Sequence, residues 1–147
     1  KRVEPTVTEI EKEYGNKVKI VWRDLPLPFH QEAPGAAQAA REAYAQKGNA
    51  GFWKFHGKLF EASGSPDGLK RPGLDKIAEE LGLDMAKFKA AMDSGEHKAR
   101  VEKDAEVANK AGVSGTPSFV INGYYISGAQ PISAFKKVIN RAMKEVK

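Results

Sequence analysis

The first apolar positions of the chain recur with helical spacing. Four of them share one face of a helix predicted over residues 3–14, namely Val3, Val7, Ile10 and Tyr14. Pro5 lies within this stripe, where it belongs either to the first turn or to a kink. Gly15 ends the predicted helix, because glycine accepts the positive φ of a helix C-terminus.

The pattern then changes to that of a strand. Residues 17–25 are rich in β-branched and aromatic side chains that mostly alternate with polar ones, which predicts a β-strand. Pro26 and Pro28 follow and favour an extended exit from it.

From about residue 34 to residue 111 the spacing is helical. Gly48 separates a helix that begins at Pro34 from a second one over 50–61, which carries a dense aromatic face. Residues 63–73 contain three Gly and two Pro and predict a loop. Three more helices are expected, over 74–81, from an Asp84 cap onward and over 96–111.

Near the C-terminus the spacing of the apolar residues changes from the helical period of about 3.6 residues to the strand period of 2. Residues 118–121 and 124–127 flank Asn122-Gly123, a pair typical of the type I′ turn of a β-hairpin. Pro131 then opens a last helix with one apolar face.

The composition narrows the chemistry. The chain has 147 residues, which suits one domain. It contains no cysteine, so disulfides, thiolate metal sites and cysteine nucleophiles are excluded within these residues. No apolar run approaches the roughly 20 residues of a membrane-spanning helix, so we expect no membrane span.

The charge is a modest excess of cations. Lys and Arg number 24 against 19 Asp and Glu, a net charge of +5, and the two signs are interleaved along the chain. This distribution is typical of a solvated surface. The excess of cations alone is weak support for nucleic-acid binding, which ranks below the two hypotheses given at the end of this section. Such binding would require an affinity that falls steeply with salt.

Few side chains suggest a conventional active site. His30, His56 and His97 are too scattered for a metal motif, and His56 is expected to be a packing residue of the aromatic helix. Glu79 and Glu80 read as exposed helical charge. The sequence has no phosphate-binding loop and no dinucleotide fingerprint, so we expect no metal and no cofactor.

One proline does not fit an ordinary pattern. Pro117 directly precedes the strand over 118–121, and proline lacks the N–H that a central strand needs. It therefore belongs at the first residue of the strand, in a special turn or in an ordinary loop.

Several segments, which occur along the chain in the family's order, resemble the DsbA-like thiol–disulfide oxidoreductases of the thioredoxin fold. Residues 112–123 (GVSGTPSFVING) resemble the family's segment around its cis-proline, and 126–130 (ISGAQ) resemble the entry into its last helix. Residues 24–30 (DLPLPFH) resemble the exit from its second strand, and 52–56 (FWKFH) a helix of its helical insertion. The resemblance covers essentially the whole chain.

The resemblance implies an α/β, thioredoxin-like fold with an inserted helical subdomain. It implies a single domain over 1–147, with a core of 1–30 and 112–147 and a helical insertion of 31–111. It also implies a first strand and a Cys-x-x-Cys motif that these residues lack. Pro5 matches the family's proline five residues after the second cysteine, so that cysteine would stand directly before Lys1. We therefore expect these residues to be the remainder of a longer protein.

Thr116 and Pro117 are the site positions that the resemblance carries over. Joined by a cis bond, they would face the missing cysteines, and the backbone before Pro117 would pair with an extended substrate. Within the 147 residues we therefore expect a substrate-binding pair and no catalytic residue.

The leading hypothesis is a thiol–disulfide oxidoreductase that acts on protein thiols and disulfides through a mixed disulfide. Its partners would be extended protein or peptide substrates and a redox partner protein. The alternative is a redox-inactive thioredoxin-fold module that binds peptides. The resemblance implies the bacterial cell envelope or periplasm as the compartment. Oxidase, reductase and isomerase all remain open, as does the oligomeric state.

Overall fold

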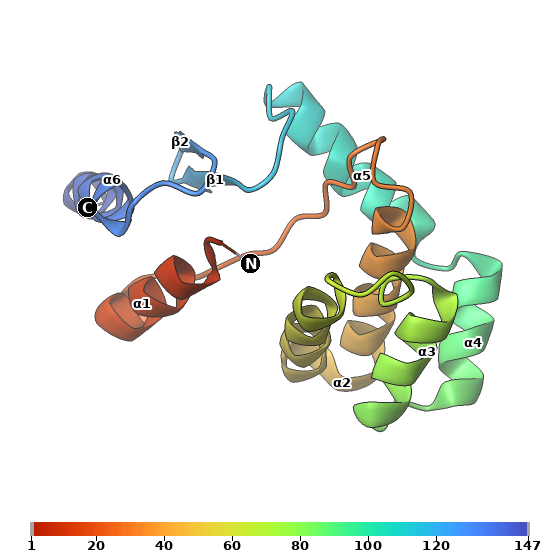
Figure 1. Cartoon of the computed structure of the whole chain (residues 1–147). Coiled ribbons are helices and arrows are strands. Elements are labelled where there is room, and N and C mark those ends of the chain that lie inside the picture. Colours follow the sequence, from red (N-terminus) through yellow and green to blue (C-terminus); the bar gives the residue numbers. More distant parts are fainter. Residues whose placement is uncertain (1, 147) are drawn as a thin grey trace. The chain divides into compact units, whose positions relative to one another are not determined.

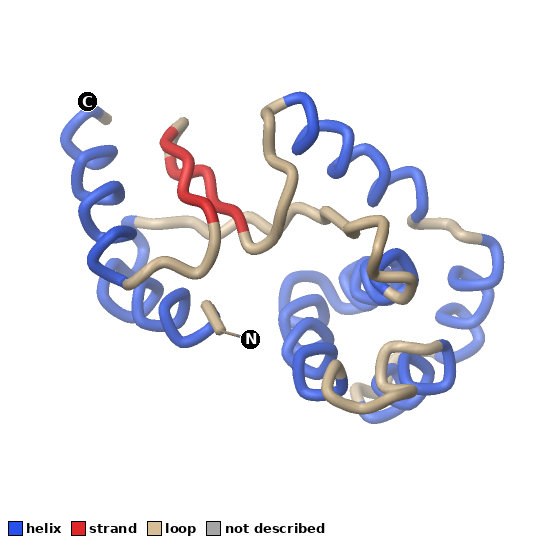
Figure 2. The backbone as a smooth tube through the Cα atoms, turned by 45° about the horizontal axis from the view of Figure 1, so that its top comes forward, coloured by secondary structure: helices blue, strands red, loops and turns tan. Residues whose placement is uncertain are grey.

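The chain forms two compact units in a computed structural model that describes residues 2–146 (Figures 1 and 2). The first unit joins the N-terminal residues, up to Trp22, to the C-terminal residues from Asn109 onward. The second unit is Arg23–Ala108 and is helical. The domain boundaries implied by the resemblance remain a prediction.

The first unit packs two helices against a β-hairpin. Its elements in chain order are α1 (Glu4–Tyr14), the 3-10 helix η1 (Gly15–Lys17), β1 (Ser118–Ile121), β2 (Tyr124–Ser127) and α6 (Ile132–Glu145). Pro5 lies in the first turn of α1, where its missing N–H costs no hydrogen bond. Ile10 of α1, Ile126 of β2 and Phe135 of α6 belong to one apolar core.

The hairpin has the turn that the sequence predicts. β1 and β2 are antiparallel, with Ser118 opposite Ser127. Asn122 has φ 46° and Gly123 has φ 91°, so both central residues take the positive φ of a type I′ turn. The prediction from the Asn-Gly pair is therefore confirmed.

The strand predicted over 17–25 is wrong. After η1 the backbone is extended, but within residues 2–146 the sheet consists of β1 and β2 alone. An extended segment becomes a strand through hydrogen bonds to a neighbour. The resemblance assigns that neighbour to a strand that these residues lack. Val18 nevertheless packs against the apolar core of the first unit.

The helical unit begins with a long helix that is broken once. Its elements are α2 (Ala33–Ala62), α3 (Arg71–Glu80), α4 (Met85–Ser94) and most of α5 (Lys98–Lys110). Gly48 within α2 has φ 63° and ψ −154°, so α2 consists of two runs that change direction there, as predicted (Figure 1). A side chain at Gly51 would collide with the carbonyl oxygen of Ala43, so the second run starts tightly against the first.

The start of α3 corrects a second prediction. The helix begins at Arg71 rather than at Leu74, because Pro72 fits the first turn of a helix as well as it fits a loop. The cap of α4 is as expected: the Asp84 carboxylate accepts hydrogen bonds from the backbone N–H groups of Ala86 and Lys87, at 3.0 and 3.1 Å.

The core of the helical unit comes from α2, α3, α4 and the Leu83 segment. Phe55 and Phe88 are fully buried in it, with their ring centres 6.1 Å apart. Within residues 2–146, no helix combines the length and the apolar character that crossing a membrane requires.

Candidate functional site

The expected substrate-binding pair lies on the segment that leads into β1. Gly112, with φ 73°, turns the chain after α5, and Val113 is buried at 9% exposure. Thr116 is exposed and Pro117 is half-buried. The peptide bond between Thr116 and Pro117 is cis.

Hydrogen bonds on both sides hold this segment in place. The Gly128 N–H donates to the Pro117 carbonyl at 2.9 Å, and the Ser118 hydroxyl donates to the Gly115 carbonyl at 2.7 Å. Thr116 lies between these two anchors, and among the described residues its own N–H and C=O make no backbone hydrogen bond. The exposed Thr116 therefore stands between two hydrogen-bonded neighbours directly before a strand.

A tyrosine hydroxyl lies beside this segment. The Ser118 Oγ and the Tyr125 phenol oxygen are 3.0 Å apart across the hairpin. Hydrogen bonding to Ser118, and secondarily to Ser127, lowers the pKa of Tyr125 below its usual value. The outer face of the hairpin is thus polar next to Thr116 and carries the exposed Val120 further along.

The N-terminal turn of α1 belongs to the same unit as Thr116. Val3, which precedes α1, is buried in the core that contains Ile126 and Phe135. The helix N-terminus is therefore anchored against the hairpin and α6. Such a terminus lowers the pKa of a thiol through its free N–H groups and the helix dipole. The 147 residues supply no cysteine for it to act on.

The three histidines belong to the helical unit and not to the unit that contains this site. His56 is buried in α2, with ring centres 4.7 Å from Phe60 and 5.3 Å from Trp53. Burial lowers its pKa to about 4, so it packs as a neutral ring, as the sequence analysis expected. Glu79 and Glu80 are exposed. No grouping of three potential metal ligands occurs among the described residues.

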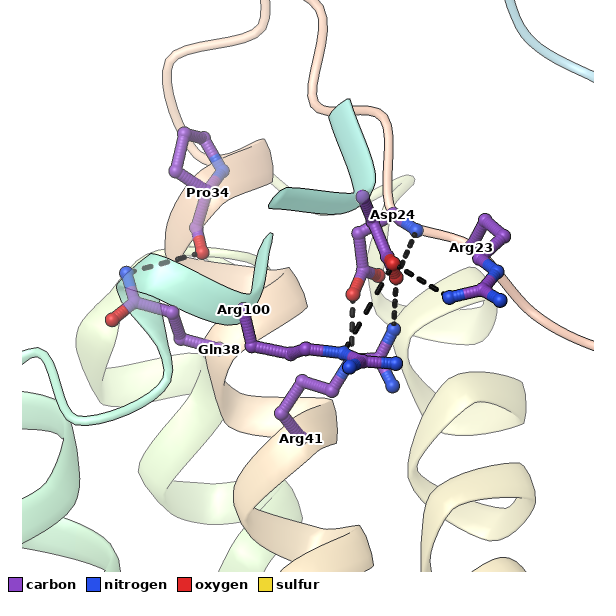
Figure 3. A network of polar contacts seen from close by, with 7 residues as sticks. Arg23, Asp24, Pro34, Gln38, Arg41 and Arg100 are labelled. Carbon is purple, nitrogen blue, oxygen red and sulfur yellow. Dashed lines mark hydrogen bonds and ion pairs between the residues drawn. The ribbon is translucent and has the colours of Figure 1, made fainter. Parts of the chain in front are cut away.

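Sequence reasoning missed the buried charges of the helical unit. Asp24, Glu42 and Asp104 are 2–5% exposed, and Arg41 contacts both aspartates (Figure 3). In the sequence these residues look like ordinary members of interleaved charge. The one signal was spacing: Asp104 falls three residues after the apolar Val101 in the same predicted helix, and both are buried.

Comparison with known proteins decides the family. Residues 1–141 match the model of a protein family described as Thioredoxin. The chain belongs to the thioredoxin family. The resemblance to DsbA-like proteins and the thioredoxin-like fold class are confirmed with it.

Two curated relatives of this thioredoxin-family chain are different kinds of protein. A Na(+)/H(+) antiporter NhaA 3 of Salinispora tropica is 34% identical over 96% of the chain, which spans only 21% of that protein. A probable disulfide bond formation protein D of Bacillus anthracis is 29% identical over 92% of the chain, which spans 64% of that protein.

A solved structure shows the same fold. The thioredoxin-like oxidoreductase from Silicibacter pomeroyi DSS-3 superposes with a TM-score of 0.73 at 26% sequence identity. The match covers 97% of the chain and 80% of the solved chain.

Proposed function

We propose that these residues are the substrate-holding part of a thiol–disulfide oxidoreductase whose Cys-x-x-Cys lies directly upstream of Lys1. The observation that carries the proposal is the backbone of the exposed Thr116, which makes no backbone hydrogen bond among the described residues while both its neighbours accept one. The relatives named for disulfide bond formation support the redox role over the redox-inactive alternative.

The substrate is an extended segment of a protein or peptide that carries thiols. Its backbone pairs with the N–H and C=O of Thr116, as a strand adds to a sheet edge, while Pro117 contacts it through an apolar ring. Backbone pairing does not depend on the substrate's side chains, so this site accepts many sequences. The periplasm or cell envelope is the compartment in which such a reaction persists.

The proposed reaction is an exchange of sulfur–sulfur bonds. A substrate thiolate attacks one sulfur of the oxidised cysteine pair; the bond within the pair breaks and its other sulfur leaves as a thiolate. A second substrate thiolate then attacks the mixed disulfide, so the substrate becomes a disulfide and the pair a dithiol. The substrate loses two electrons and two protons, and a redox partner protein reoxidises the pair.

The substrate contact is tested on the parent polypeptide, meaning the proposed longer chain that includes the upstream Cys-x-x-Cys. It is held in a mixed disulfide with a one-cysteine peptide. We expect hydrogen exchange of the Thr116 amide, followed by NMR, to slow by about tenfold or more in the complex. Replacing one backbone carbonyl of the peptide by a methylene group should cancel this protection, because it removes the acceptor for the Thr116 N–H without changing the protein.

The amide of the exposed residue Ser114, two residues earlier, is the internal control and its exchange should not change. If the mixed disulfide forms and the Thr116 amide exchanges at its free rate, the proposed substrate contact is wrong.

The redox role needs a separate test. The parent polypeptide should oxidise a two-cysteine fluorogenic peptide with one disulfide consumed per disulfide formed, and alanine at either upstream cysteine should abolish turnover. A parent without the cysteine pair that still binds the peptide through Thr116 would be the redox-inactive module instead.

A further inference from the structure

α5 is attached to the helical unit differently from its neighbours. The apolar cluster of that unit is built from α2, α3, α4 and Leu83, and it contains no residue of α5. The buried residues of α5 are Val101 and Asp104, one apolar and one charged. What fixes α5 to the rest of the unit must therefore be largely polar.

Asp104 makes the first attachment, near the middle of α5. Its Oδ2 accepts from Arg41 of α2 at 2.6 Å and lies 3.3 Å from the Asp24 N–H, while its Oδ1 accepts from Arg23 at 2.9 Å (Figure 3). Arg41 also donates through Nε to Asp24 at 2.6 Å. Arg100, one turn before Asp104, places its Nε 4.0 Å from Oδ1.

His97 makes the second attachment, directly before α5. Its Nε2 lies 2.6 Å from Oε2 of the buried Glu42, and Gln46 donates to the other oxygen of the same carboxylate at 2.7 Å. Gln46 also exchanges hydrogen bonds with the backbone of Asp84, so this contact is tied to the start of α4.

The order of the groups fixes one register. Neighbouring residues of α2 present a cation, Arg41, and a carboxylate, Glu42, to a carboxylate, Asp104, and an imidazole, His97. A shift of α5 that brought Asp104 against Glu42 would place two carboxylates together in a buried place, which is strongly unfavourable.

We propose that α5 is held on α2 by these two polar contacts, those of Asp104 and of His97. It can be released without disrupting the core of α2, α3 and α4. The chain runs from the end of α5 through Val113 to Thr116, so α5 is the last element of the helical unit before the substrate segment.

Hydrogen exchange of the parent polypeptide, resolved by mass spectrometry into peptides of each helix, tests the proposal. Arg41→Met leaves the carboxylates of Asp24 and Asp104 without their shared cation. We expect exchange in α5 to rise by about tenfold or more, while exchange in α3 and α4 changes much less.

Arg71→Met is the matched control. Arg71 also joins two elements, through Asp75 of α3 at 2.7 Å and Asp93 of α4 at 2.5 Å, but it is 37% exposed and its helices share an apolar core. This variant should leave the exchange of every helix nearly unchanged.

Arg41→Lys provides the answer if Arg41→Met fails to fold, because lysine keeps the charge but lacks the planar guanidinium that binds both carboxylates at once. It should raise hydrogen exchange in α5 selectively, by a smaller factor than Arg41→Met. An equal acceleration of α3, α4 and α5, or no acceleration of α5 in either variant, overturns the proposal.

Discussion

His56 is a titratable side chain that the fold keeps neutral. It lies among the rings of Phe52, Trp53 and Phe60, and burial lowers its pKa from 6.5 to about 4. Between these two pH values the unfolded chain binds a proton that the folded chain does not. The free energy of unfolding therefore falls as the pH drops from 6.5 towards 4.

Replacing this side chain should remove that pH dependence. In His56→Phe, the loss of stability between pH 7 and pH 4.5 should be smaller than in the unchanged chain by about 2–3 kcal/mol. Urea unfolding at each pH measures this loss of stability through the fluorescence of Trp53. Trp22 is replaced by Phe in both proteins, so that Trp53 is the single fluorescent tryptophan. His30→Gln, at an exposed position, is the control. Equal losses for His56→Phe and the unchanged chain would contradict the expectation.

At the scale of elements, the hairpin rests on two residues with positive φ. Asn122 and Gly123 set the type I′ turn, which aligns β1 with β2 and brings Phe119 onto α6, 4.9 Å from the ring centre of Phe135. A change in the turn is therefore felt in the core of the first unit.

A pair of glycine substitutions separates this role from helix propensity. Gly123→Ala places a Cβ at φ 91° and should lower the free energy of unfolding by about 1–2 kcal/mol. Gly57 lies in α2 with open space around its Cβ position, so Gly57→Ala should raise the free energy of unfolding by up to about 1 kcal/mol. Denaturant unfolding of both variants gives the sign, and like signs would contradict this account of the turn.

Elements with local signals were the predictable ones. Asn122-Gly123 specified the hairpin, Asp84 the start of α4 and Gly48 the break in α2, because turns and caps are set by a few adjacent residues. Residues 17–25 had the right composition for a strand but no partner in the described sheet, and pairing is a long-range property. The contacts of Arg41 with Asp24 and Asp104 were invisible for the same reason, since they join residues far apart in the sequence.

For the candidate site, the sequence indicated a segment but not the hydrogen bonds that hold it. Pro117 signalled a special segment before β1, and the resemblance added Thr116. The anchoring bonds that isolate the Thr116 peptide unit come from Gly128 and Ser118, whose roles depend on the folded hairpin.

At the scale of the molecule, each unit has its own apolar core. Phe135 is 1% exposed in the core of the first unit, and Phe88 is fully buried in that of the helical unit. A cavity in one core removes contacts from that unit alone.

Matched truncations test this independence. Phe135→Ala and Phe88→Ala should each destabilise by about 3–5 kcal/mol. Hydrogen exchange should accelerate first in the unit that carries the substitution. If each variant accelerated both units equally, the two cores would be acting as one cooperative structure.

The break at Gly48 bears on how the helical unit forms. It divides α2 into runs over 33–47 and 49–62, each close to the roughly 12–15 residues below which an isolated helix is marginal in water. Neither run nucleates a lasting helix by itself, so each depends on the other and on α3 and α4 for its stability. The assembly of this unit is therefore a collective event, in which helix formation and burial of Phe55 and Phe88 occur together.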